Sequence, residues 1–134
     1  MPETAPAPPP PQTDRNRRVL VVEDERTIRQ SIAGYLGDAG YTVDEASNGT
    51  EALASMEAAL PDVVVLDLLM PVMGGRAFMQ ACREQPHFAM VPVILLSAAH
   101  DLTQATEQLQ PRASLAKPID LDVLLAIVDR VANY

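Results

Sequence analysis

Aromatic residues and cysteine are both scarce in this sequence. Tryptophan is absent and aromatic residues make up 4% of the chain, so a hydrophobic core must be built from aliphatic side chains and methionine. The single cysteine, Cys82, excludes an internal disulfide bond and favours a reducing compartment. Apolar runs stay far below the roughly 20 residues of a membrane-spanning helix, and the N-terminal segment lacks the apolar stretch of a signal peptide. The sequence therefore predicts a cytoplasmic protein that does not enter a membrane.

Basic residues are also few. The chain has 10 Lys and Arg against 18 Asp and Glu, and its net charge of -8 argues against nonspecific binding to nucleic acids or anionic membranes. A hydrophobic fraction of 48% in 134 residues suffices for one folded domain. Prolines concentrate in residues 1–16, which predicts a disordered leader, and a solvated tail is favoured over an SH3-type ligand. We therefore expect the folded domain over residues 17–134.

Short apolar runs alternate with segments of helical periodicity along the rest of the chain. Five such β-α repeats with short connections predict a doubly wound α/β domain. Its five-stranded parallel sheet should have the flavodoxin-like strand order 2-1-3-4-5, with the switch point between the first and third strands. We expect strands at 18–22, 41–46, 62–66, 92–96 and 113–116, and helices at 25–39, 51–60, 75–84, 101–109 and after Asp120, which should cap the last one.

One carboxylate, Asp67, ends the apolar run Val63–Leu66. An unpaired Asp within a buried strand would be costly, so it is expected at the strand's C-terminal end, where a parallel sheet opens into its ligand crevice. An Asp that starts a turn or caps a helix would fit the same stretch equally well. This stretch alone leaves both readings open.

Polar residues follow four of the expected strands and should meet at one edge of the sheet. They are Glu23 and Asp24 after the first strand, Asp67 after the third, Ser97 after the fourth and Lys117 after the fifth. Three neighbouring carboxylates repel one another, and a hard divalent cation relieves that repulsion. The set therefore predicts a Mg²⁺ site beside a candidate nucleophile, Asp67.

The expected Mg²⁺ ligands are Glu23, Asp24, Asp67 and the backbone carbonyl of Leu69. Attack of Asp67 on a phosphoryl group would be helped by the metal, and two donors, Lys117 and the Ser97 hydroxyl, would hold the remaining phosphoryl oxygens.

In these motifs the chain resembles the receiver domain of two-component response regulators. The resemblance covers about residues 17–133 and rests on the segments 19–25, 65–71 with Gly75, 95–98 and 117–118 in this order. It implies an aspartyl-phosphate switch charged by the phosphohistidine of a sensor histidine kinase or phosphotransfer protein. Asp67 matches the phosphoacceptor, and Lys117 matches the phosphate-contacting lysine, followed by a cis bond to Pro118. By the same match, Glu23 and Asp24 are the metal-binding acidic pair and Ser97 is the switch residue.

The sequence departs from the family pattern on the side expected to report phosphorylation. Ser114 stands where receivers usually carry Tyr or Phe, so the aromatic half of the switch is missing. Lys117 follows Ser97 early, which predicts a short helix over 101–109. The face formed by this helix, strand 113–116 and the last helix is a common dimer surface in the family, so a homodimer is possible here.

Three functions remain open. Because the chain ends at Tyr134, a stand-alone receiver that docks to other proteins or relays phosphate is the leading hypothesis, and it is not expected to be an enzyme. A pseudo-receiver, which docks without aromatic switching, is suggested by Ser114. A haloacid-dehalogenase-like phosphatase would need a second acid two residues after its nucleophile, where this chain has Leu69.

We predict slow autodephosphorylation. Receivers that lose phosphate fast often carry polar side chains two residues after the phosphoacceptor and two after the switch residue, where they orient the attacking water. Leu69 and Ala99 occupy these positions and cannot do so. The phosphoryl half-life of the purified protein with Mg²⁺ measures this, and a half-life of seconds would contradict it.

Overall fold

The computed structural model describes residues 16–133, so the predicted disordered leader lies almost wholly outside the described residues. Within them no helix is both long and apolar enough to cross a membrane. Strands and helices alternate, with one additional short helix. In chain order they are β1 Arg18–Val22, α1 Arg26–Asp38, β2 Thr42–Ala46, α2 Gly49–Ala58, β3 Val63–Asp67, α3 Gly75–Arg83, α4 Pro86–Ala89, β4 Val93–Ala98, α5 Ala99–Leu109, β5 Ala113–Lys117 and α6 Leu121–Ala132.

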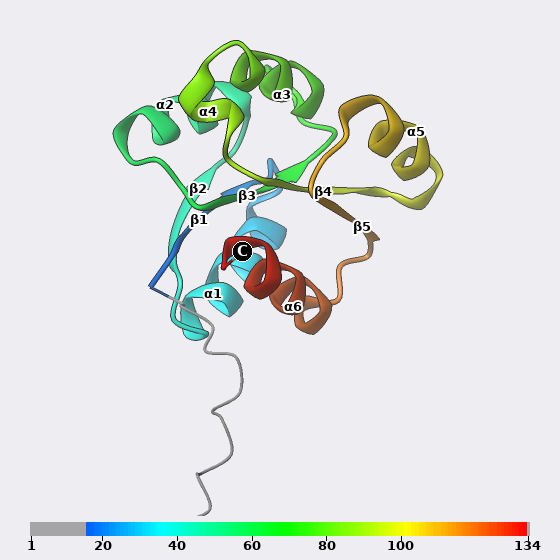
Figure 1. Cartoon of the computed structure of the whole chain (residues 1–134). Helices are drawn as coiled ribbons and strands as arrows, with labels where there is room; N and C mark the ends of the chain where they lie inside the picture. The colour runs from blue at the N-terminus through cyan, green and yellow to red at the C-terminus, as the bar shows by residue number, and fades with distance from the viewer. Residues whose placement is uncertain (1–15, 134) are drawn as a thin grey trace, which may run out of the picture.

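All strand pairs are parallel, and the sheet order β2-β1-β3-β4-β5 confirms the prediction. Helices α1 and α6 cover one face, whereas α2, α3, α4 and α5 cover the other (Figure 1). Right-handed crossovers impose this arrangement, because the chain must leave to opposite faces when it builds outward from β1 in both directions. The strand order reverses between β1 and β3, and the carboxyl ends of both strands open there.

Two aliphatic cores hold the sheet in place. On β1, Val19 and Val21 face the cluster under α1 and α6, whereas Leu20 and Val22 face the cluster under α2, α3 and α5. This alternation buries the central strands on both sides, which explains why they read as continuous apolar runs. Both phenylalanines of the chain are fully buried in the second of these clusters. The cores make the strands rigid, and the strand ends thereby become fixed positions for polar side chains.

Side-chain caps fix two helix starts. Asn48 accepts a hydrogen bond from the Glu51 N–H, and Glu51 in return accepts one from the Ser47 N–H, so two free helix donors are satisfied. Asp120 accepts from the first N–H groups of α6, which confirms the predicted cap.

Helix α3 ends at Arg83, before Pro86, as the sequence predicts. The short helix α4, which Pro86 begins, was not predicted; proline needs no hydrogen bond to its nitrogen in the first turn of a helix. One predicted helix length was wrong. Helix α5 was expected to be short, yet it has 11 residues. It starts at Ala99, directly after β4, and this tight connection leaves room for a full helix before Lys117. It ends at Gln110, which has φ 49° and precedes Pro111.

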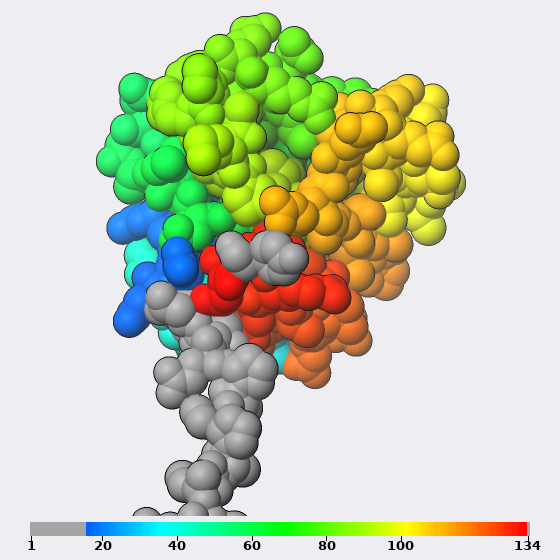
Figure 2. Space-filling model, in the orientation of Figure 1, coloured from blue at the N-terminus to red at the C-terminus, as the bar shows by residue number. Residues whose placement is uncertain are grey.

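The surfaces of α5, β5 and α6 are contiguous. In the space-filling view the yellow-to-orange surface of α5 and β5 continues into the orange-to-red surface of α6 (Figure 2). Every residue of β5 is only partly buried, because β5 is the edge strand beside β4. Ser114 lies on this strand and is partly buried.

Gly75 is required by close packing at the start of α3. A Cβ at this position would lie 2.9 Å from the Asp67 carbonyl oxygen and 2.9 Å from Leu68 Cα, both backbone atoms that cannot move aside cheaply. By contrast, a Cβ at Gly34, on the exposed side of α1, would meet nothing within 4 Å.

We therefore expect opposite effects from two glycine-to-alanine substitutions. Gly75→Ala should lower the free energy of unfolding by about 1–3 kcal/mol, because the backbone after Asp67 must shift. Gly34→Ala should raise it by about 0.5–1 kcal/mol, because alanine loses less backbone entropy in a helix. Urea denaturation of both variants measures this, and a neutral Gly75→Ala would contradict the close packing.

Candidate functional site

The polar residues predicted to meet at one edge of the sheet do lie there. Glu23 and Asp24 follow β1 directly, Asp67 is the last residue of β3, and Lys117 is the last residue of β5. Lys117 Nζ lies 3.1 Å from Asp67 Oδ1 and 3.4 Å from Glu23 Oε2. Glu23, Asp24 and Asp67 each place one carboxylate oxygen within 4.8 Å of the others. Four of the predicted residues thus form one cluster at the switch point.

Ser97 lies on the neighbouring strand at the same edge. It follows Leu96, the β4 partner of Asp67 in the sheet register. Its side chain is buried, and within residues 16–133 its hydroxyl oxygen has no hydrogen-bond partner. A buried hydroxyl without a partner is unusual and costs free energy, which points to a group that the site receives from outside.

The carboxylates of the cluster differ in burial. Glu23 is 1% exposed and Asp67 is 3% exposed, whereas Asp24 is exposed. Lys117, 28% exposed, is the only cation among the cluster's ion pairs in the described chain. One ammonium cannot neutralise three carboxylates, so the site carries uncompensated negative charge in a poorly solvated position.

The ionisation of Glu23 and Lys117 reflects this imbalance. Burial, followed by the hydrogen bond and charge repulsion with Asp67, raises the pKa of Glu23 from 4.5 to about 7, although Lys117 opposes the shift. Burial lowers the pKa of Lys117, but the hydrogen bond and charge of Asp67, aided by Glu23, outweigh it and the net pKa is raised. The Lys117 ammonium therefore stays charged. A cation that binds the cluster would displace the proton from the Glu23 carboxyl group.

The donor set fits a hard divalent cation. Three carboxylates of mixed burial supply oxygen ligands, and the exposed Asp24 leaves a path for hydrated ions to enter. Burial is the main cause of the raised pKa of Glu23, and repulsion by Asp67 adds to it, so a bound cation would relieve part of this cost. Mg²⁺ suits such a site because it binds a few carboxylates and keeps several waters.

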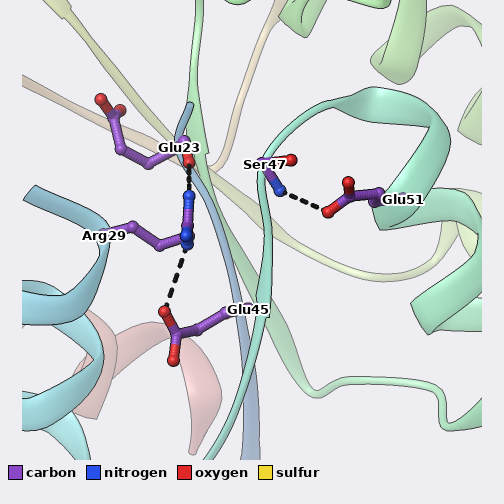
Figure 3. Close-up of polar contacts among 5 residues, drawn as sticks. All are labelled: Glu23, Arg29, Glu45, Ser47 and Glu51. Atoms are coloured by element: carbon purple, nitrogen blue, oxygen red, sulfur yellow. Dashed lines mark hydrogen bonds and ion pairs between the residues drawn. The ribbon is translucent and has the colours of Figure 1, made fainter. Parts of the chain in front are cut away.

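Arg29 supports the acidic turn, Glu23 and Asp24, by binding its main chain. The sequence patterns did not identify this residue. Its Nη1 donates to the main-chain carbonyl of Glu23 at 2.9 Å, and its Nε donates to Glu45 Oε1 at 3.2 Å (Figure 3). Nothing in the sequence pattern of the expected helix 25–39 distinguishes Arg29 from a surface arginine. Only the packing of α1 against the end of β2 brings it to Glu23.

The loop after Asp67 is tightly held at its base and strained at its tip. Gly75 N–H donates to the Leu68 carbonyl at 2.9 Å, and Leu68 N–H donates to Leu96 at 3.0 Å. Val72 has φ 69°, a left-handed conformation that β-branched residues rarely adopt, and its side chain is 87% exposed. Leu69, two residues after Asp67, is also exposed. The predicted cis bond between Lys117 and Pro118 is confirmed.

The fold and the cluster together define a doubly wound domain with an acidic, lysine-paired site at its switch point. A family model for the response regulator receiver domain matches residues 19–129. The chain belongs to this family, so the resemblance found in the sequence is confirmed. Receiver domains are signalling phosphoacceptors of two-component systems, bind Mg²⁺ at an acidic pocket and interact with histidine kinases or phosphotransfer proteins.

Individual relatives agree with this assignment. The chain is 38% identical over 113 residues to the response regulator Rre1 of Synechocystis sp., a match that spans 82% of this chain and 49% of Rre1. It is 36% identical to the DNA-binding transcriptional regulator NtrC of Salmonella typhimurium, over 87% of this chain and 25% of NtrC. The structure of the chemotaxis response regulator CheY4 of Vibrio cholerae matches with a TM-score of 0.78 at 36% identity, covering 86% of this chain and 98% of CheY4.

We predict that Glu23 makes the stability of the metal-free protein fall with rising pH. Its folded-state pKa of about 7 exceeds its ordinary value of 4.5, so its contribution is fully present below about pH 4.5 and is lost as the pH rises through 7. The loss is at most about 3 kcal/mol. Glu23→Gln should remove it and be the more stable protein at alkaline pH.

Denaturant unfolding in the presence of a chelator, below and above this pH window, measures the difference between wild type and variant. The exposed Glu57→Gln serves as the matched control and should keep the wild-type dependence. Parallel pH profiles for wild type and Glu23→Gln would contradict the prediction.

Proposed function

We propose that this chain is an aspartyl-phosphate switch in which Asp67 accepts a phosphoryl group. The observation that carries the proposal is the buried Asp67 carboxylate, 3.1 Å from Lys117 Nζ and within the acidic cluster. Such a carboxylate is a candidate nucleophile that pairs with a neighbouring ammonium and can share a divalent cation.

Each residue of the site has a proposed part in phosphoryl transfer. An Asp67 carboxylate oxygen forms a bond to phosphorus while the bond from phosphorus to the donor's histidine nitrogen breaks, and that nitrogen keeps the electron pair. Lys117 donates to one phosphoryl oxygen, and the Ser97 hydroxyl, which lacks a partner within residues 16–133, donates to another. Glu23, Asp24, Asp67 and the Leu69 carbonyl would hold Mg²⁺, which would supply charge neutralisation for the phosphoryl oxygens.

We further propose that the phosphodonor is a sensor histidine kinase or a phosphotransfer protein and that the chain itself is not an enzyme. Action as a stand-alone cytoplasmic receiver stays a prediction, as does dimerisation on the contiguous surface of α5, β5 and α6 (Figure 2). CheY4, which this chain covers almost completely, is comparable in length, whereas Rre1 and NtrC are longer.

A pseudo-receiver is the second candidate, and Ser114 favours it. Ser114 is partly buried on β5, three residues before Lys117. Its side chain has no ring that could move between buried and exposed positions when Ser97 engages a phosphoryl group. The acidic site could therefore be intact although the surface of α5, β5 and α6 does not respond to phosphorylation.

We expect acetyl phosphate with Mg²⁺ to add one base-labile phosphoryl group to the wild-type protein. Asp67→Asn should lose the adduct completely, because the amide is not a nucleophile toward phosphorus. Asp62→Asn, just before the opposite end of the same strand, is the matched control and should keep it. Intact-protein mass spectrometry measures both, and an adduct that persists in Asp67→Asn would contradict the assignment.

The same phosphorylated sample distinguishes a switching receiver from a pseudo-receiver and from a phosphatase. Amide chemical shifts that change around both Ser97 and Ser114 on phosphorylation favour a switching receiver. An adduct without such changes favours the pseudo-receiver. Repeated turnover of a generic phosphate ester would instead favour a phosphatase.

A further inference from the structure

We propose that Arg29 is a positioning residue for the cation site, which it serves by locking the Glu23–Asp24 peptide in place. The proposal rests on the proposed function, because it presupposes that Glu23, Asp24 and Asp67 hold the cation. Within residues 16–133 the Arg29 guanidinium hydrogen-bonds the Glu23 carbonyl and Glu45, not an expected ligand carboxylate, so it acts through the main chain.

Glu23 lies just beyond the paired part of β1, and its main chain is held on both sides. Its N–H donates to the Ala46 carbonyl on β2 at 3.0 Å, and its carbonyl accepts from Arg29 Nη1 at 2.9 Å. In Figure 3 the Glu23 side chain extends away from Arg29, whereas its carbonyl faces the guanidinium. Since a trans peptide is planar, fixing this carbonyl fixes the plane from which the Asp24 main chain continues.

Arg29 is itself anchored at both ends. Its N–H donates to the Glu25 carbonyl in the first turn of α1, and its Nε is paired with Glu45 on β2. The side chain is only 16% exposed. The planar guanidinium offers donors in a fixed fork, so one bond to Glu45 orients the other toward Glu23.

A purely structural bridge between neighbouring elements is the competing explanation. The chain offers a direct comparison, because Arg18, at the opposite end of β1, pairs with Asp44 on β2 at 2.6 Å. Both arginines tie onto β2, but only Arg29 reaches the acidic turn. Loss of either should lower stability, and only loss of Arg29 should disturb the cation site.

Simple electrostatics predict the opposite change in Mg²⁺ affinity when Arg29 is removed, so the test separates the two explanations. Removing a positive charge near an acidic cluster should by itself strengthen the binding of Mg²⁺. Positioning predicts a weakening instead, of about 10- to 100-fold, as is typical when groups that orient metal ligands are removed.

Isothermal titration calorimetry with Mg²⁺ on wild type, Arg29→Met, Arg29→Gln and Arg18→Met tests the proposal. Circular dichroism confirms that each variant is folded at the chosen temperature. We expect both Arg29 variants to bind Mg²⁺ at least about tenfold more weakly, and Arg18→Met to bind like wild type. Wild-type or tighter binding by either folded Arg29 variant would overturn the proposal, as would equal weakening in Arg18→Met. Absence of binding by the wild type would instead refute the proposed metal site.

Discussion

The repulsion among carboxylates at the ends of β1 and β3 is the constraint on which the rest of this structure depends. Glu23 and Asp67 are almost fully buried, and Asp24 lies beside them, with Lys117 as their cation in the described chain. Burial raises the pKa of Glu23 to about 7, which shows that the fold holds this acid at a cost. Without a cation, the buried carboxylates repel one another. A bound cation relieves this repulsion, and the site therefore favours cation binding.

Maintaining such a cluster requires a rigid support. The two aliphatic cores on either face of the sheet fix β1 and β3 side by side, and side-chain packing leaves the strand ends little freedom. Beyond the last paired residues the main chain needs other partners. Arg29 supplies one at Glu23, and the hydrogen bond from Gly75 to Leu68 supplies another after Asp67. The chemistry of the site is thus carried by carboxylates, and its geometry by main-chain hydrogen bonds next to them.

Two features outside the acidic cluster stand out. Ser114 replaces the expected aromatic residue on the edge strand β5, and Val72 has a strained, exposed conformation in the loop between β3 and α3. Strain of this kind persists only where the surrounding structure imposes it, and it commonly marks functional loops. Leu69 and Val72 are exposed on the loop after β3, and Ser114 is the position on β5 where the sequence departs from the family pattern.

Sequence patterns alone predicted the fold class and the residues of the cluster. Apolar runs of β-branched residues predicted the parallel strands, and parallel strands bring their carboxyl ends to one edge, so Glu23, Asp24, Asp67, Ser97 and Lys117 could be placed together without coordinates. Local signals were weaker at boundaries: the short helix α4 that Pro86 begins was not predicted, and α5 begins directly after β4. Only the tertiary structure decided that Glu23 is buried enough to hold its proton near pH 7 and that Arg29 reaches its carbonyl. Both depend on how α1 and β2 pack around the acidic turn, and no periodicity along the chain records such a contact.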